Sequence, residues 1–233
     1  MGWNGRLLVA LSDSQTAPSL DASALITIDT QRDLLDDGAF PIAGTSAVLP
    51  AMRRLIEGFR AVRRPIVHIV RLYEPDGSNA EPCRRELLAA GAQILIRGTP
   101  GCQIATELLP EPDVQLDAAL LLAGRPQSLG AHEVAIYKPR WGAFYRTPLE
   151  KYLRERGIST VVFAGCNFPN CPRTSIYEAS ERDFRVVAIR DAISGLYERG
   201  ERELLNIGVQ LLTAEEVTSS VRSVHGEPAR VRS

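Results

Sequence analysis

The chain has 233 residues, of which 45% are hydrophobic and 24% are charged, and its formal net charge is -1 at pH 7. These values are ordinary for a soluble globular protein and give no electrostatic reason to expect nucleic acid or a membrane as a partner. No apolar run reaches the roughly 18 residues of a membrane span, and the first residues lack a signal-peptide pattern. We therefore expect a cytoplasmic protein with reduced cysteines and a single domain over residues 1–233.

The N-terminal region, residues 1–22, carries little pattern, which predicts an extended arm. The first predicted strand covers 24–28, and Asp29 follows it directly, with Gln31 two positions later. An aspartate at this point either forms a turn or has a function at the strand end. A helix with apolar residues at helical spacing comes next, and the second predicted strand covers 66–70.

The periodicity weakens between residues 72 and 130, where proline, glycine, aspartate and asparagine are frequent. Only two short helices are predicted there, over 84–90 and 117–123. We interpret 72–130 as an insertion over the sheet, of the kind that often forms binding loops or lids. Cys83 and Cys102 lie within it, and we assign them no function.

Another strand is predicted over 134–137 and ends at Lys138, one of only two lysines among 27 basic residues. A compact ammonium group suits a crowded site in a sequence that otherwise uses arginine, although a surface lysine is an equally simple interpretation. Trp141, Phe144 and Tyr145 follow on a loop, where they either pack locally or form the wall of a pocket.

Strands and helices also alternate in the C-terminal half. The predicted elements are strands over 160–164 and 186–189 with a helix between them, a helix over 199–207, a strand over 209–212, and a tail over 214–233 with a short helix near its start. This alternation predicts an α/β fold of three layers (α/β/α), Rossmann-like, with a mostly parallel six-stranded sheet.

The helix after the 160–164 strand has a marked start, because Pro172 suits the first helical position and makes Cys171 the N-cap residue. Unpaired N–H groups and the positive end of the helix dipole stabilise an anion there, which predicts a lowered thiol pKa and a nucleophilic thiolate. The alternative is a small buried hydrophobic residue.

Three candidates, Asp29, Lys138 and Cys171, each lie just beyond the carboxyl end of a predicted strand. Ligands of parallel α/β sheets bind at that edge, so we expect the three side chains to meet there. A thiol, an acid and a cation are the groups that covalent acyl transfer requires.

These residues also resemble a family. Residues 25–33 (Leu-Ile-Thr-Ile-Asp-Thr-Gln-Arg-Asp), 138–144 (Lys-Pro-Arg-Trp-Gly-Ala-Phe) and 165–174 are similar to three ordered motifs of the isochorismatase-like cysteine hydrolases. The resemblance implies that Asp29, Lys138 and Cys171 form a catalytic triad. It also implies a cis peptide between Cys166 and Asn167, with the N–H groups of Asn167 and Cys171 facing an oxyanion.

The loop before the nucleophile departs from the family pattern: Phe168-Pro169-Asn170 stands where a Thr-Asp pair is common, and Pro172 replaces a common valine. The family's substrates therefore do not transfer directly to this chain. We expect a partly aromatic substrate pocket, and its predicted residues are Gln31, Trp141, Phe144, Tyr145, Asn167 and Phe168.

No metal and no cofactor are expected, because the paired histidines of the nicotinamidase-like metal site have no counterpart after the second strand. We expect His68, His132 and His225 to be structural or exposed. The expected partners are a small-molecule substrate and further copies of the chain, because the family commonly assembles as dimers or tetramers. Neither nucleic acid nor a membrane is expected.

The resulting hypothesis is a cysteine hydrolase that cleaves an amide, ureido or imide-type C–N bond of a small molecule. Two alternatives stay open. One is a vinyl-ether hydrolase acting on isochorismate, which does not need a thiol nucleophile. The other is a noncatalytic or redox-responsive binding protein with a disulfide between Cys166 and Cys171, although a spacing of five is not a Cys-X-X-Cys motif.

Overall fold

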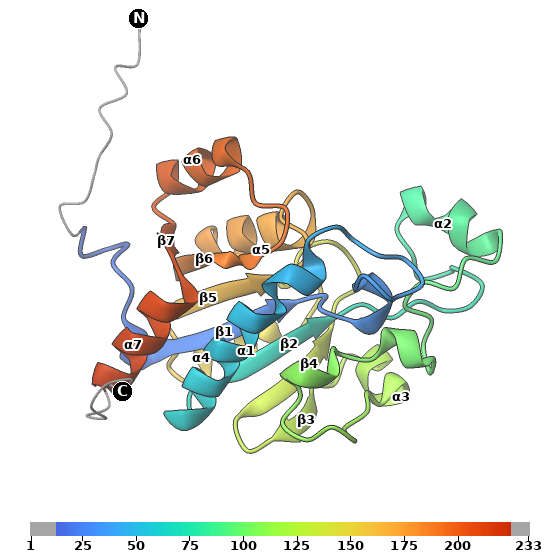
Figure 1. Ribbon diagram of the computed structural model, residues 1–233, viewed down its shortest axis with the longest axis horizontal. Coiled ribbons are helices and arrows are strands. Elements are labelled where there is room, and N and C mark those ends of the chain that lie inside the picture. Colours follow the sequence, from blue (N-terminus) through green and yellow to red (C-terminus); the bar gives the residue numbers. More distant parts are fainter. Residues whose placement is uncertain (1–12, 225–233) are drawn as a thin grey trace, which may run out of the picture.

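The computed structural model describes residues 13–224, so the beginning of the predicted arm and the end of the predicted tail lie outside the described residues. Seven strands form one sheet in the order β3-β4-β2-β1-β5-β6-β7 (Figure 1). The strands are β1 (Ser23–Ile28), β2 (Ile66–Val70), β3 (Gln127–Gly130), β4 (Glu133–Tyr137), β5 (Thr160–Gly165), β6 (Arg185–Ile193) and β7 (Gln210–Leu212).

The predicted α/β class and mostly parallel sheet are confirmed, and the sheet has one strand more than the six expected. The additional strand, β3, is antiparallel to β4 at the edge of the sheet and lies in the predicted insertion. Its sequence, Gln-Ser-Leu-Gly, is short, polar and only partly buried, so it lacks the apolar pattern by which strands are found.

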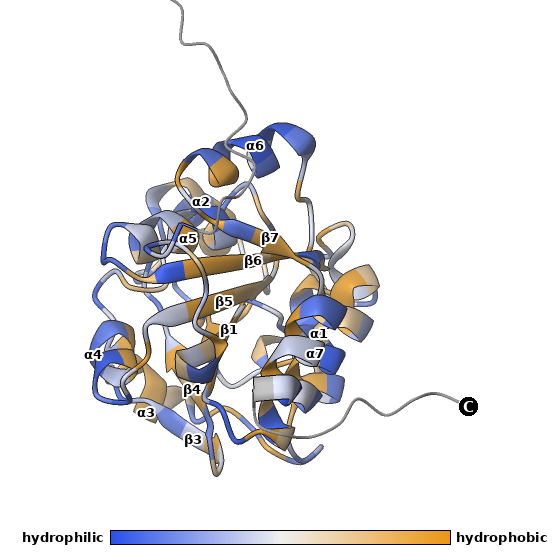
Figure 2. Cartoon of the chain, turned by 90° about the vertical axis from the view of Figure 1, so that its left-hand side faces the viewer, coloured by the Kyte–Doolittle hydropathy of each residue, from blue (hydrophilic) through white to orange (hydrophobic). Residues whose placement is uncertain are grey.

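The helices are α1 (Thr45–Ala61), α2 (Pro82–Ala89), α3 (Ala118–Leu122), α4 (Leu149–Arg154), α5 (Cys171–Ser180), α6 (Glu198–Asn206) and α7 (Ala214–Val224). Figure 2 shows α1 and α7 on one side of the strands and α4 and α5 on the other. Each face has its own apolar core: residues such as Phe59 and Val217 pack on the first, and Leu153 and Ile176 on the second. This arrangement gives the three layers that the sequence predicts.

The central strands are apolar on both faces. Every residue of β1 and of β5 is buried, as expected for parallel strands covered by helices on each side. Within residues 13–224, no helix combines the length and apolar character needed to cross a membrane.

The predicted insertion packs at the end of the sheet towards which β1 and β2 point, where Figure 1 shows α2 and α3. An isolated bridge between Gln31 and Ile104 joins it to the segment after β1, and a second one, between Tyr73 and Ile96, lies within it. A third apolar cluster, which includes Leu34 and Leu95, lies beneath it. The insertion therefore covers the carboxyl edge of the sheet, where ligands of this fold class bind.

Candidate active site

Four neighbouring strands each deliver a polar side chain to one edge of the sheet. Asp29 follows β1, Arg71 follows β2, Lys138 follows β4, and the loop that leads to Cys171 follows β5. The strands lie side by side in the order β4-β2-β1-β5, and all of these pairs are parallel. Their carboxyl ends therefore bring four residues together that are far apart in the sequence.

The predicted trio is in direct contact. Lys138 Nζ lies 2.8 Å from Asp29 Oδ2 and 3.2 Å from Cys171 Sγ. Lys138 is fully buried, and Asp29 and Cys171 are 5% and 8% exposed. A buried charge is tolerated only with a partner, so the ammonium and carboxylate groups hold each other beside the sulfur.

The two oxygens of the Asp29 carboxylate differ in their contacts. Oδ2 contacts Lys138, whereas Oδ1 is buried and has no hydrogen-bond partner among residues 13–224. The backbone of Asp29 is left-handed, with φ at 48°, a conformation that aspartate tolerates better than most residues. Its N–H donates to the Ile69 carbonyl at 2.9 Å, which fixes the carboxylate at the end of the sheet.

Cys171 is the first residue of α5, and Asn170 is the N-cap residue, one position earlier than predicted. The predicted lowering of its thiol pKa is wrong: the pKa of Cys171 is raised to about 12. Burial is the main cause and the negative charge of Asp29 adds to it, while Lys138 and Arg71 act in the opposite direction. Removal of the thiol from water outweighs the helix terminus, so the resting sulfur is a protonated thiol.

The loop between β5 and α5 has the backbone that the family resemblance implied, because the peptide bond between Cys166 and Asn167 is cis. Gly165 precedes it with φ at 125°, and a side chain there would lie 2.3 Å from the Ile28 carbonyl oxygen. The Phe168 N–H donates to the Ser194 carbonyl at 2.8 Å and holds the loop against the end of β6.

A small cavity adjoins the trio. Its lining residues are Asp29, Leu34, Ile42, Arg71, Tyr73, Glu81, Arg84, Leu95, Trp141, Cys166, Asn167, Asn170 and Cys171. Of the predicted pocket residues, Trp141 and Asn167 are present. The other four lie elsewhere.

Gln31 and Phe168 are structural instead. Gln31 is buried, and its side-chain amide is fully occupied by the backbone of Arg71 and of Cys102. Phe168 is fully buried and packs edge-on against Tyr197, with ring centroids 5.3 Å apart. Neither side chain lines the cavity, because each has a partner on another side of its loop.

Phe144 and Tyr145 also lie away from the cavity. The Phe144 ring packs against Phe184, with centroids 5.8 Å apart, in the core beneath α4 and α5. Tyr145 is 43% exposed and lies near the guanidinium of Arg146. Local packing, the simpler interpretation of aromatic residues on a loop, applies to both.

Sequence reasoning missed the polar wall of the cavity, formed by Arg71, Tyr73, Glu81 and Arg84. Arg71 was detectable, because it follows a strand just as Asp29 and Lys138 do. Glu81 and Arg84 come from the insertion, whose weak periodicity gave no indication of which residues turn towards the sheet.

His68, His132, Cys83 and Cys102 do not line this cavity, whereas Cys166 does. His68 is buried in β2 between Thr27 Oγ1 and Glu133 Oε1, each at 2.8 Å, and His132 is exposed. His225 lies outside the described residues. Within residues 13–224, no group of three or more histidine, cysteine or acidic residues is arranged to hold a metal ion, and all four cysteines are free thiols.

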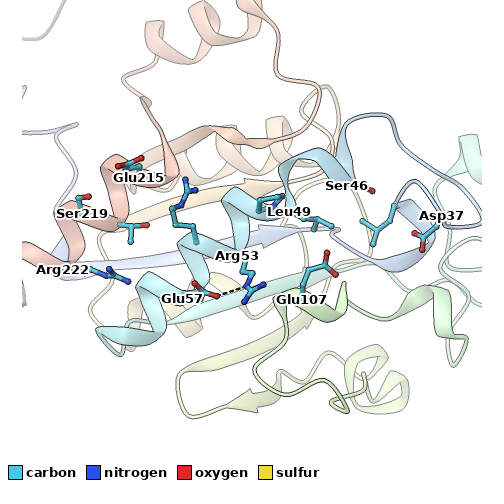
Figure 3. A pocket seen from close by; sticks show the side chains of 13 residues that line it. Asp37, Ser46, Leu49, Arg53, Glu57, Glu107, Glu215, Ser219 and Arg222 are labelled. Carbon is cyan, nitrogen blue, oxygen red and sulfur yellow. Dashed lines mark hydrogen bonds and ion pairs between the residues drawn. The ribbon is translucent and has the colours of Figure 1, made fainter. Parts of the chain in front are cut away.

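A larger hollow lies along α1 and α7, on the face of the sheet that these helices cover (Figure 3). Charged side chains such as Arg53, Glu57, Glu107 and Arg222 line it, and Arg53 is paired with Glu57. Its lining includes no cysteine, and the Arg53–Glu57 pair is exposed rather than buried. The small cavity beside Cys171 is therefore the candidate active site.

Comparisons with known proteins agree with the family resemblance of the sequence motifs. The isochorismatase domain model matches residues 115–219. The chain is 26% identical over 201 residues to "Probable inactive nicotinamidase" of Arabidopsis thaliana, which covers 83% of this chain and 93% of that protein. It is 25% identical over 210 residues to the ureidoacrylate amidohydrolase RutB of Methylorubrum extorquens, and this match covers 82% of this chain and 77% of that protein.

Among solved structures, an isochorismatase family protein from Desulfovibrio vulgaris superposes with a TM-score of 0.73 at 27% identity, covering 86% of this chain and 98% of that one. The structural match covers more of the chain than the segment that the domain model matches. Together, the domain match, the relatives and the shared structure show that the chain is similar to proteins of the isochorismatase family over most of its length.

Proposed function

We propose that this chain hydrolyses a C–N bond of a small amide or ureido compound through an acyl-thioester on Cys171. The observation that carries the proposal is the contact of Lys138 Nζ with both Asp29 Oδ2 and Cys171 Sγ, in a buried site open to a small cavity. The relative named ureidoacrylate amidohydrolase supports the same bond type.

In the first half of the reaction, the free Oδ1 of Asp29 accepts the thiol proton while Cys171 Sγ forms a bond to the substrate carbonyl carbon. Because the thiol pKa is raised, proton removal and attack occur together rather than through a stable resting thiolate. The carbonyl electron pair moves onto oxygen. The N–H groups of Asn167 and Cys171 are the proposed donors to that oxyanion, and Cys171 is at a helix start, where N–H groups lack intrahelical partners.

The tetrahedral intermediate then collapses. The C–N bond breaks, and the nitrogen takes the proton from Asp29, so that an amine or ammonia leaves and a thioester remains. Water attacks the thioester, gives a proton to Asp29, and displaces the sulfur, which recovers its proton. The net products are a carboxylic acid and an amine or ammonia, and Lys138 compensates the negative charge of each step.

An ammonia-release assay over amides, ureas and carbamoyl compounds tests the proposal. Cys171→Ala removes the sulfur and is expected to abolish turnover. Cys83→Ala is the matched control, because Cys83 is exposed on α2 and does not line the cavity. Ammonia release that survives in Cys171→Ala would overturn the thioester route. Hydrolysis of isochorismate by both the wild type and Cys171→Ala, without ammonia release from any compound of the panel, would favour the vinyl-ether alternative.

A further inference from the structure

The cavity beside Cys171 contains a buried guanidinium with an unused end. Arg71 is 3% exposed, and its Nη2 donates to Glu81 Oε1 at 2.5 Å. Its Nη1 is buried and has no hydrogen-bond partner among residues 13–224. A buried donor without a partner is costly, so such a group is expected to meet water or a ligand.

The orientation of Arg71 is fixed by its neighbours. Glu81 is held at both oxygens, because Oε1 accepts from Arg71 and Oε2 accepts from the Tyr73 hydroxyl at 2.8 Å. The backbone of Arg71 is held by Gln31, which accepts from its N–H at 2.8 Å and donates to its carbonyl at 2.8 Å. A guanidinium held at its base and at one nitrogen presents the other nitrogen in a fixed direction.

Arg71 lines the same cavity as Asp29 and Cys171, and its charge interacts with both. The half-buried Arg84 lines it too, with its guanidinium 5.5 Å from the centre of the Trp141 ring and its buried Nε unpartnered within the described part of the chain. Two arginines, each with a buried nitrogen that has no partner within the described part of the chain, therefore line the cavity.

The charges around the cavity are unbalanced. Three cations, Arg71, Arg84 and Lys138, face two carboxylates, Asp29 and Glu81. These five side chains, of which only Arg84 is not fully buried, therefore carry a net charge of +1 when all are ionised. One carboxylate would balance that charge, and its planar pair of oxygens matches the planar fork of a guanidinium.

We propose that Arg71 Nη1, assisted by Arg84, is a subsite for a carboxylate, and that the substrate is a short amide or ureido acid whose carboxylate lies close to the scissile bond. This inference rests on the proposed C–N hydrolysis and specifies its substrate class. The remaining lining combines the apolar side chains of Leu34, Ile42 and Leu95 with the polar residues Asn167 and Asn170, and the cavity is small, which favours a short substrate.

Matched substrates test the subsite: N-carbamoylglycine carries the carboxylate, and N-carbamoylglycinamide replaces it by a neutral amide of similar size. We expect a kcat/KM at least 10-fold higher for the acid. In Arg71→Gln, the kcat/KM for the acid should fall by about 10- to 100-fold more than that for the amide, as loss of a charged hydrogen bond implies. Arg53→Gln, an exposed arginine of α1, is the control and should change neither value.

Binding gives a second readout that does not need turnover. Calorimetry on Cys171→Ser should show at least 10-fold tighter binding of the acid than of the amide, and Arg71→Gln in that background should remove the difference. If Arg71→Gln fails to fold because Glu81 is left unpaired, the double variant Arg71→Gln/Glu81→Gln or the single variant Arg84→Gln replaces it.

Equal binding of the two compounds, or binding of neither, would overturn the subsite. The same experiments test the proposed hydrolysis separately. Cys171-dependent ammonia release from neutral amides, with no preference for acids, would support C–N bond hydrolysis and reject the carboxylate subsite. Preference for the acid that persists in both Arg71→Gln and Arg84→Gln would also reject the assignment.

Discussion

Gln31 holds the backbone of Arg71 on both sides. Its Oε1 accepts from the Arg71 N–H and its Nε2 donates to the Arg71 carbonyl, each at 2.8 Å, and all of these groups are buried. A side-chain amide thereby completes the hydrogen bonds that β2 leaves open at its end. Gln31, which the sequence predicts to line the pocket, instead fixes the backbone of Arg71, and Arg71 lines the cavity.

Gln31→Met keeps the approximate volume of the side chain but removes the clamp. We expect the free energy of unfolding to fall by about 1–3 kcal/mol, because buried backbone groups lose their partners. Urea denaturation measures the change. Gln93→Met is the control, since Gln93 is exposed, and an equal effect of the two substitutions would contradict the clamp.

The two lysines provide a matched pair for the buried charge. Lys138→Met leaves the Asp29 carboxylate buried without its cation, and we expect a loss of about 3–5 kcal/mol in unfolding free energy together with loss of hydrolysis. Lys151 is 79% exposed and only 3.8 Å from Glu155 at the surface, so Lys151→Met should change stability by less than about 0.5 kcal/mol. Chemical denaturation of both variants measures the two changes in unfolding free energy, and equal changes would contradict the prediction.

Asp29→Asn separates thiol reactivity from hydrolysis. Asp29 raises the pKa of Cys171, so its removal should lower that pKa and increase the rate of iodoacetamide labelling at a given pH near 8. Hydrolysis should nevertheless be lost, because the proton acceptor is gone. Peptide mapping by mass spectrometry locates the label, and Asp29→Asn/Cys171→Ala provides the blank. Slower labelling at Cys171 would show that Asp29 does not suppress the thiolate.

Gly165→Ala tests the loop that leads to Cys171. The added methyl group would lie 2.3 Å from the Ile28 carbonyl oxygen, and φ at this residue is 125°. We expect a loss of about 3 kcal/mol or more, or a protein that does not fold. Gly157→Ala is the control: its φ is 66°, but no atom lies within 4 Å, so only about 1–2 kcal/mol of backbone strain applies. Equal thermal stability of the two variants would contradict the role of the close contact.

Glu133 predicts a pH dependence of stability. Burial acts to raise its pKa, but hydrogen bonds from His68 and Arg60 outweigh burial, so the folded-state pKa lies below the ordinary value. The stabilisation is therefore fully present above about pH 4.3, the value of a free glutamate, and is lost as the pH falls through the lower folded-state pKa. Urea unfolding between pH 7 and 3 should show a smaller acid-dependent loss in Glu133→Gln than in the wild type. Glu57→Gln, at an exposed position, should follow the wild-type curve.

The sequence alone determined the α/β class, six of the seven strands and the positions of Asp29, Lys138 and Cys171 at strand ends. These features follow from local patterns: apolar runs form strands buried on both faces, and a parallel sheet presents all of its carboxyl ends at one edge. The structure bears out this juxtaposition, whereas the catalytic roles stay predictions for the experiments above.

The tertiary structure decided what surrounds the trio. Burial reversed the expected shift of the Cys171 pKa, because a helix terminus is visible in the sequence but the removal of water is not. Aromatic residues such as Phe144 and Phe168 turned into the core, and Arg71, Glu81 and Arg84 formed the cavity wall in their place. Which side of a loop faces a cavity depends on contacts between distant segments, and local sequence carries no record of those contacts.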